Sequence, residues 1–169
     1  MNRILNLICP TSHLEHFISR KTNDENIVNY FVTSLGLGLH LHKQDQAEQL
    51  KTTLQTLEIV EIRLFQDVYC PFIQNALEKA RPREFYIDHI LEGIYSEQAA
   101  MADFSKADYQ SKAKKIAERN LVTQLEAMHG NPTLASYILQ RNLVLKGIIV
   151  NKTEGAILRE FKYLPRYSA

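Results

Sequence analysis

The sequence alternates short apolar runs with amphipathic segments, and this alternation restricts the fold more than any other feature. The apolar runs cover residues 4–8, 29–35, 59–65 and 143–150. Segments with helical spacing separate them, most clearly over residues 45–57, where apolar side chains recur every three or four positions. Repeated strand–helix–strand order predicts an α/β fold with a mostly parallel central sheet flanked by helices.

The other predicted elements complete this plan. Pro71 suits the first turn of a helix, and a long helical region follows over residues 87–128. A shorter helix is expected over residues 134–139. The polar residues 151–155 then predict a turn into a C-terminal edge strand at residues 156–161.

Composition favours one cytoplasmic domain. The chain has 169 residues, of which 45% are hydrophobic, so residues 1–169 are expected to share one core. Twenty Lys and Arg against nineteen Asp and Glu leave a net charge of +1, which favours neither nucleic acid nor an acidic membrane as a partner. The first ten residues lack the features of a signal peptide, and no apolar run is long enough to span a bilayer.

The two cysteines, Cys9 and Cys70, each follow a predicted strand. Because parallel strands end at the same edge of a sheet, both side chains are expected at the carboxyl edge, where open α/β sheets form their ligand crevice. In a reducing compartment, a metal-binding pair or two core thiols are favoured over a disulfide. The helix that begins at Pro71 would stabilise a Cys70 thiolate.

Four segments in the last third of the chain resemble the end of a β-class carbonic anhydrase. They read Asn-Leu-Val-Thr-Gln-Leu over residues 120–125, Asn-Pro at 131–132, Leu-Val-Leu-Lys-Gly over 143–147 and Thr-Glu-Gly-Ala-Ile-Leu over 153–158. In the same register, Cys9 and Cys70 match the positions of the family's zinc-binding cysteines. The resemblance implies the family's fold and its carbon dioxide hydration, a zinc cofactor and assembly as a homodimer.

The motifs that this resemblance brings into register depart from the family pattern. Where the family has Cys-x-Asp-x-Arg, this chain has Cys9-Pro-Thr-Ser-His13, so Thr11 and His13 occupy the positions of the catalytic Asp-Arg dyad. Where the family has His-x-x-Cys, this chain has Asp67-x-x-Cys70. Because zinc accepts thiolate, imidazole and carboxylate ligands, the implied metal set is Cys9, Asp67 and Cys70, with His13 as a candidate fourth ligand.

Three hypotheses follow. The favoured one is a divergent protein of this fold that is non-catalytic or weakly active and serves as a binding or regulatory protein, with or without zinc. The alternative is an active zinc lyase that hydrates carbon dioxide to bicarbonate. In the first case, the cysteines can also be simple core residues, with Asp67 capping the helix that follows. The third hypothesis is a site for an anion or other unidentified small ligand at the helix start near Pro71.

Two other pairs of residues have side chains that could ligate a metal or act in catalysis. His40 and His42 alternate as two metal ligands would, but nothing with ligand spacing accompanies them; Asp88 and His89 are adjacent on a predicted helix and so point about 100° apart. Both pairs are expected at the surface. The apolar strand at 143–150 and the aromatic residues over 161–167 both need cover, which a two-fold homodimer would supply.

Overall fold

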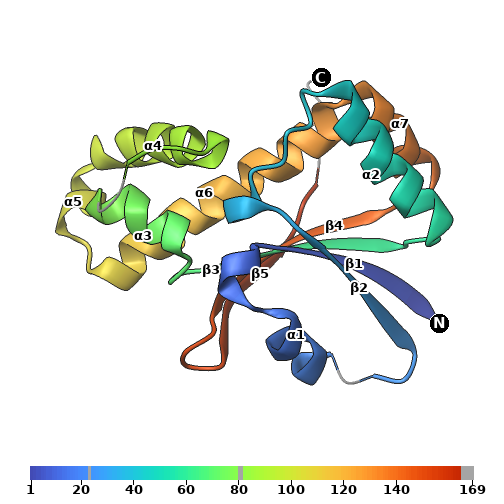
Figure 1. Ribbon diagram of the computed structural model, residues 1–169. Helices are drawn as coiled ribbons and strands as arrows, with labels where there is room; N and C mark the ends of the chain where they lie inside the picture. Colours follow the sequence, from blue (N-terminus) through green and yellow to red (C-terminus); the bar gives the residue numbers. More distant parts are fainter. Residues whose placement is uncertain (23, 80–81, 165–169) are drawn as a thin grey trace.

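The protein is built on a five-stranded mixed sheet with helices on both faces (Figure 1). The computed structural model describes residues 1–22, 24–79 and 82–164. The strand order is β2-β1-β3-β4-β5, in which the first four strands are parallel and β5 is antiparallel to β4. This arrangement confirms the predicted α/β class and the C-terminal edge strand.

The elements follow the alternation expected from the sequence. The strands are β1 Asn2–Ile8, β2 Ile27–Thr33, β3 Glu61–Asp67, β4 Val144–Asn151 and β5 Ala156–Lys162. The helices are α1 Glu15–Lys21, α2 Gln44–Thr56, α3 Pro71–Glu78, α4 Tyr86–Ala99, α5 Ala102–Lys106, α6 Tyr109–Gly130 and α7 Pro132–Gln140. Short 3-10 turns lie at Pro10–Ser12 and Leu35–Leu37.

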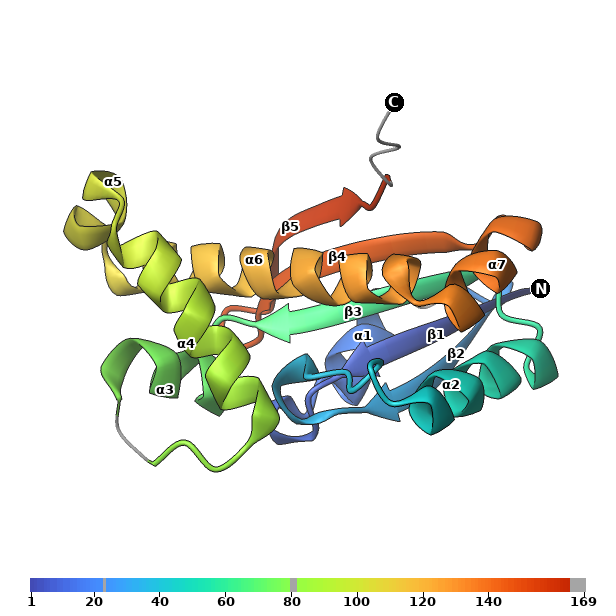
Figure 2. The same cartoon turned by 90° about the horizontal axis from the view of Figure 1, so that it is seen from above.

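The two faces of the sheet are covered unequally. Helices α2, α6 and α7 lie over one face, and the larger hydrophobic cluster fills the space beneath them (Figures 1 and 2). On the other face α1 packs over a smaller cluster that includes Ile8, Phe65 and Val150. Helices α3, α4 and α5 extend beyond the carboxyl ends of the central strands (Figure 2).

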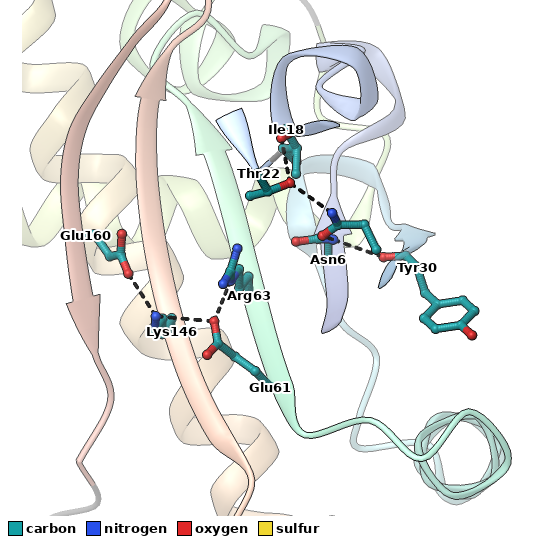
Figure 3. A network of polar contacts seen from close by, with 9 residues as sticks. Asn6, Ile18, Thr22, Tyr30, Glu61, Arg63, Lys146 and Glu160 are labelled. Carbon is teal, nitrogen blue, oxygen red and sulfur yellow. Dashed lines mark hydrogen bonds and ion pairs between the residues drawn. The ribbon is translucent and has the colours of Figure 1, made fainter. Parts of the chain in front are cut away.

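The amino-terminal half of the α1 face carries polar side chains instead of a helix (Figure 3). Lys146 pairs with Glu61 at 3.3 Å and with Glu160 at 3.1 Å, and Arg63 also pairs with Glu61. The amide of Asn6 donates to the backbone oxygen of Tyr30 at 3.2 Å. These contacts pair charged and amide groups on a part of the sheet that no helix covers.

Two of the boundaries that differ from the sequence prediction have an identifiable cause. Strand β2 ends at Thr33, because Gly36 adopts a left-handed φ of 56° that a strand cannot continue. The long helical region divides into α4, α5 and α6. Its last helix, α6, begins after Asp108, whose carboxylate accepts the backbone N–H of Ser111 at 2.7 Å as an N-terminal cap.

Strand β5 lies against β4 because Gly147 has no side chain. A Cβ at this position would come 2.3 Å from Cζ of Phe161, the residue opposite it in the antiparallel pair. Tyr163 extends the contact, since it packs against the larger cluster and its ring lies 6.1 Å from that of His129. Phe161 and Tyr163 thus find partial cover within the chain, whereas Leu164 is 70% exposed and Tyr167 lies outside the described residues.

None of the helices in the described part of the chain has the length and apolar character needed to cross a membrane.

Candidate functional site

The two cysteines meet at the carboxyl edge of the sheet. Strands β1 and β3 are parallel neighbours in which Ile8 lies opposite Phe65, so Cys9 leaves β1 beside the end of β3. Cys70 follows β3 after a short turn and is the N-cap residue of α3. Both side chains are fully buried in the larger hydrophobic cluster, with 0% exposure. The topology therefore assembles a buried thiol pair from residues 61 positions apart.

Two polar groups contact the Cys9 sulfur. The backbone N–H of Gly36 donates to it at 3.1 Å, and the hydroxyl of Thr11 lies at hydrogen-bond distance, 3.0 Å away. The neighbouring Cys70 thiol, and after it the Thr11 and Gly36 contacts, lower the pKa of Cys9 from 9.0 to about 6 although burial opposes the change.

Cys70 behaves in the opposite way. The neighbouring Cys9 sulfur, and then burial, raise the pKa of the Cys70 thiol well above its usual value. The N–H of Phe72 in the first turn of α3 counters this change in part. The buried hydroxyl of Ser12 faces the Cys70 thiol without completing a hydrogen bond of ordinary geometry. The surroundings therefore make Cys9 the more acidic of the two thiols.

Asp67, the predicted third ligand, has other partners. Its Oδ1 accepts the backbone N–H of Tyr69 at 3.3 Å and that of Lys152 at 3.4 Å. Asp67 lies opposite Val150 in the sheet, and Val150 belongs to the cluster under α1, whereas Cys9 and Cys70 belong to the cluster on the other face. Burial raises the pKa of the Asp67 carboxyl, and the two N–H groups oppose that rise. The carboxylate therefore joins the loop after β3 to the turn after β4.

His13 and Thr11 are both exposed and do not form a pair like the family's dyad. His13 has a left-handed φ of 47° at the end of the turn Pro10–Ser12. Thr11 instead directs its hydroxyl to Cys9. Across residues 1–22, 24–79 and 82–164, no group of three or more His, Cys, Asp and Glu side chains could hold a metal ion. The donor set brought together is two thiols, which falls short of the three protein ligands of a catalytic zinc site.

A buried amide network supports the thiol pair, and the sequence prediction assigned no role to it. The Nδ2 of Asn120 donates to the backbone oxygen of Gly36 and to Oε1 of Gln66, both at 3.0 Å. Gln124, one turn later on α6, donates to Asn120 at 3.2 Å and accepts the N–H of Leu39 at 3.1 Å. The signal was available, because Asn120 and Gln124 are uncharged polar residues on the apolar face of α6.

Glycine at position 36 is required by this arrangement. Beyond its left-handed backbone, a Cβ there would lie 2.7 Å from Ile87 and 3.0 Å from the ring of Phe72. The residue thus lets its N–H reach Cys9 while its carbonyl accepts Asn120. The network fixes the backbone donor that contacts the Cys9 sulfur.

The two remaining pairs of sequence candidates have contacts of their own. His40 and His42 gather around Tyr86, with ring centroids 4.4 and 5.3 Å from it, and partial burial lowers the pKa of His40. Asp88 accepts the backbone N–H groups of Glu84 and Phe85 at the start of α4. Asp88 therefore has a structural role at a helix terminus, and His40 and His42 form an aromatic cluster with Tyr86.

Comparison with solved structures identifies the fold. Two tetrameric β-carbonic anhydrases from the filamentous ascomycete Sordaria macrospora include a chain that superposes with a TM-score of 0.72 at 17% identity, covering 95% of this chain and 80% of that one. A wild-type β-carbonic anhydrase of the fungus Aspergillus fumigatus gives a TM-score of 0.71 at 15% identity, covering 97% and 90%. The Coccomyxa β-carbonic anhydrase, in complex with acetazolamide, gives 0.71 at 14% identity, covering 95% and 73%.

No protein-family model matches the sequence, and comparison with curated proteins finds no match. The structural likeness extends over nearly the whole chain, so the fold is that of the β-carbonic anhydrases.

Proposed function

We propose that this protein uses the β-carbonic-anhydrase fold as a binding or regulatory scaffold and does not hydrate carbon dioxide efficiently. The observation that carries this proposal is the donor set at the carboxyl edge of the sheet. Two thiols meet there, while Asp67 bonds backbone N–H groups of Tyr69 and Lys152. Thr11 and His13 supply no carboxylate–guanidinium pair in place of the family's dyad.

The geometry of zinc supports this reading. A catalytic zinc ion takes three protein ligands at about 2.0–2.3 Å and keeps a fourth position for water. To become the third ligand, Asp67 would have to turn from the face of the sheet where its Oδ1 accepts both N–H groups toward the face where Cys9 and Cys70 are buried. Each N–H left unsatisfied in a buried position would cost about 1–3 kcal/mol. The residues at the site therefore do not fit a catalytic zinc ion as they stand.

The alternative function is an active zinc lyase that hydrates carbon dioxide. One observation favours it: the thiols of Cys9 and Cys70 lie together, and the Cys9 sulfur is surrounded by donors that stabilise a thiolate, the form that binds metals. In that case Cys9, Cys70 and Asp67 would be the ligands, with His13 as a candidate fourth. This requires a rearrangement of the turn around Asp67.

Metal analysis combined with stopped-flow carbon dioxide hydration separates the two functions. We expect purified protein, dialysed against zinc, to hold far less than one zinc per chain and to hydrate carbon dioxide no faster than the Cys70→Ala variant. Stoichiometric zinc that disappears in Cys70→Ala, together with hydration above that variant's rate, would overturn the proposal in favour of the lyase.

A gain-of-function variant sharpens this test. Asp67→His restores the imidazole of the family motif, and we expect it to bind zinc or cobalt, with a thiolate-to-cobalt charge-transfer band in the near ultraviolet. Asp67→Asn is the matched control, because it keeps an oxygen for the N–H groups of Tyr69 and Lys152 but offers a poorer ligand. If Asp67→His binds no more metal than Asp67→Asn, the missing imidazole is not what limits binding.

We further propose that residues 1–169 act as one cytoplasmic domain that assembles as a homodimer and binds a small molecule still to be identified. Two buried, free cysteines accord with a reducing compartment. Strand β5 covers β4, so exposure of β4 no longer argues for assembly. The support comes instead from the sheet edges at β2 and β5, which have no further strand beside them among the described residues.

A further inference from the structure

A groove lies on the α1 face of the sheet, opposite the face where Cys9 and Cys70 are buried. Its deeper part has a volume of about 150 Å³ and is lined by side chains of α1, β3, β4 and β5. Its outer part, of about 270 Å³, lies between α1 and the turn that joins β4 to β5. Phe17 and Lys21 line both parts, so the two hollows adjoin at this pair. Together they reach the size of ordinary small-molecule sites.

The floor of the deeper part is apolar. It is made by side chains of the smaller hydrophobic cluster that are no more than 5% exposed, namely Phe17, Ile18, Phe65 and Ile148. Ile157 on β5 also lines this part, and it is 45% exposed. An apolar group placed here would cover the exposed part of Ile157, which favours binding because it removes apolar surface from water.

The charged side chains of the deeper part are already paired. Arg63 pairs with Glu61, and Glu160 pairs with Lys146 at 3.1 Å (Figure 3). Lys146 also pairs with Glu61, so two basic and two acidic side chains form one balanced network. This network therefore leaves no net charge to attract or repel a ligand in the deeper part.

The outer part carries two cations that lie outside this network. Arg20 and Lys21, in the last turn of α1, are exposed and make no ion pair with any residue that the structure describes. The Nζ of Lys21 lies 5.9 Å from the centre of the Phe17 ring, so this cation stands beside the apolar floor. Gly155 lines the same part, and a Cβ there would meet no atom within 4 Å, so the turn leaves the space open.

We propose that this groove binds an amphiphilic carboxylate, such as a medium-chain fatty acid. The guanidinium of Arg20 and the ammonium of Lys21 would pair with the carboxylate head, and the apolar tail would enter the deeper part beneath α1. The inference rests on the proposed function only in treating the protein as a binding scaffold, and it gives the unidentified small molecule a chemical class.

The test titrates the full-length protein with sodium decanoate in a calorimeter. We expect one decanoate per chain, whereas acetate should bind roughly a hundredfold more weakly because it has no methylene groups to bury. Replacing both Arg20 and Lys21 by alanine should weaken decanoate binding about tenfold. Arg141→Ala, at an exposed position at the end of α7, is the matched control and should leave the affinity unchanged. Equal losses in the double variant and the control, or acetate binding as tight as that of decanoate, would overturn the proposal.

A second variant tests the apolar part of the groove and leaves both cations in place. Ile157→Trp puts a larger side chain at a half-exposed strand position, so it should fill the deeper part and abolish decanoate binding while the protein still folds. Ile157→Val, which removes one methylene, is the control and should bind decanoate nearly as well as the original chain. Unchanged decanoate affinity in a folded Ile157→Trp variant would overturn the placement of the tail.

Light scattering and zinc analysis of the same samples distinguish the other outcomes. A mass that is unchanged by decanoate supports a small-molecule site, whereas a mass that falls by half would assign the groove to the interface between two copies and overturn the proposal. Zinc-free protein that binds no decanoate overturns this inference alone. Stoichiometric zinc with carbon dioxide hydration above the rate of Cys70→Ala overturns the proposed function, whatever the affinity for decanoate.

Discussion

Because Gly36 has no side chain, it can adopt a left-handed backbone, pack closely against Ile87 and Phe72, and bring its N–H to the Cys9 sulfur. Its left-handed φ of 56° ends β2, and its N–H and carbonyl connect Cys9 to Asn120. The sequence pointed to a chain break at this glycine. It did not show that the residue also supplies a donor to a cysteine 27 positions away.

Replacing this glycine tests the role. We expect Gly36→Ala to lower the free energy of unfolding by about 3 kcal/mol, because alanine disfavours the left-handed backbone and its Cβ would meet Ile87 and Phe72. Urea denaturation gives the measurement. Gly93→Ala, at an exposed position of α4, is the control. Because no atom lies within 4 Å of the added Cβ, this substitution should stabilise the protein by roughly 1 kcal/mol. Equal effects of the two substitutions would contradict this role.

The sequence also indicated that Cys9 and Cys70 would lie near one another, because each follows a strand and parallel neighbours end at the same edge. The orientation of the Asp67 side chain could not be predicted from the sequence. Side chains alternate across a strand, so the face that Asp67 occupies depends on the register of β3 against β4. Its partners also include the N–H of Lys152, which is 85 residues away. Pairings at that distance leave no local pattern.

At the scale of whole elements, the buried amide network links α6 to the sheet. Asn120 bonds Gly36 and Gln66 and is itself contacted by Gln124, so one side chain serves the turn after β2, strand β3 and helix α6. The sequence predicted each of these elements from its apolar periodicity. Periodicity reports which face is buried and gives no information on polar groups that pair within that face.

Asn120 should accordingly contribute more to the free energy of unfolding than an exposed residue of α6. We expect Asn120→Ala to destabilise the protein by about 3 kcal/mol, because it leaves the Gly36 carbonyl and the Gln66 oxygen buried without this donor. Glu126→Ala, at an exposed position of the same helix, should change stability by less than about 0.5 kcal/mol. Thermal and urea denaturation of both variants provide the comparison, and similar losses would show that the network contributes little.

The boundaries that the sequence missed have a common cause. Residues 87–128 have a nearly continuous helical pattern, yet the chain breaks twice there, and Asp108 caps the last helix. Aspartate is also tolerated within helices, so its role as a cap follows from the direction that the preceding chain takes. Tertiary packing decides between the two possibilities.

For the molecule as a whole, the order of elements was enough to predict the class of sheet. Alternating strands and helices require parallel pairing with crossovers, and the final antiparallel strand follows from the short turn before it. The number of copies in the functional assembly cannot be predicted in the same way, because it depends on surfaces that no local sequence pattern reveals.

Assembly gives a prediction at this scale. Light scattering at micromolar concentration should give about twice the chain mass of 19.5 kDa, since a two-fold contact can cover a sheet edge that has no neighbouring strand among the described residues. The measurement should be made on reduced, metal-free protein, so that neither zinc nor a disulfide between chains contributes. A single species at the chain mass across this range would contradict the homodimer.

The contacts of Lys152 determine when, during synthesis and folding, the surroundings of the two cysteines can form. Its Nζ donates to the backbone oxygen of Ser12, 140 residues earlier, and its N–H donates to Asp67. The turn after β1, the loop after β3 and the turn after β4 therefore meet only once nearly the whole chain is present. During synthesis, which runs from the N-terminus, Cys9 and Cys70 both emerge long before the segment that fixes their surroundings. Contacts between residues so far apart in sequence form slowly, so the two thiols are not yet fully buried during synthesis and early folding.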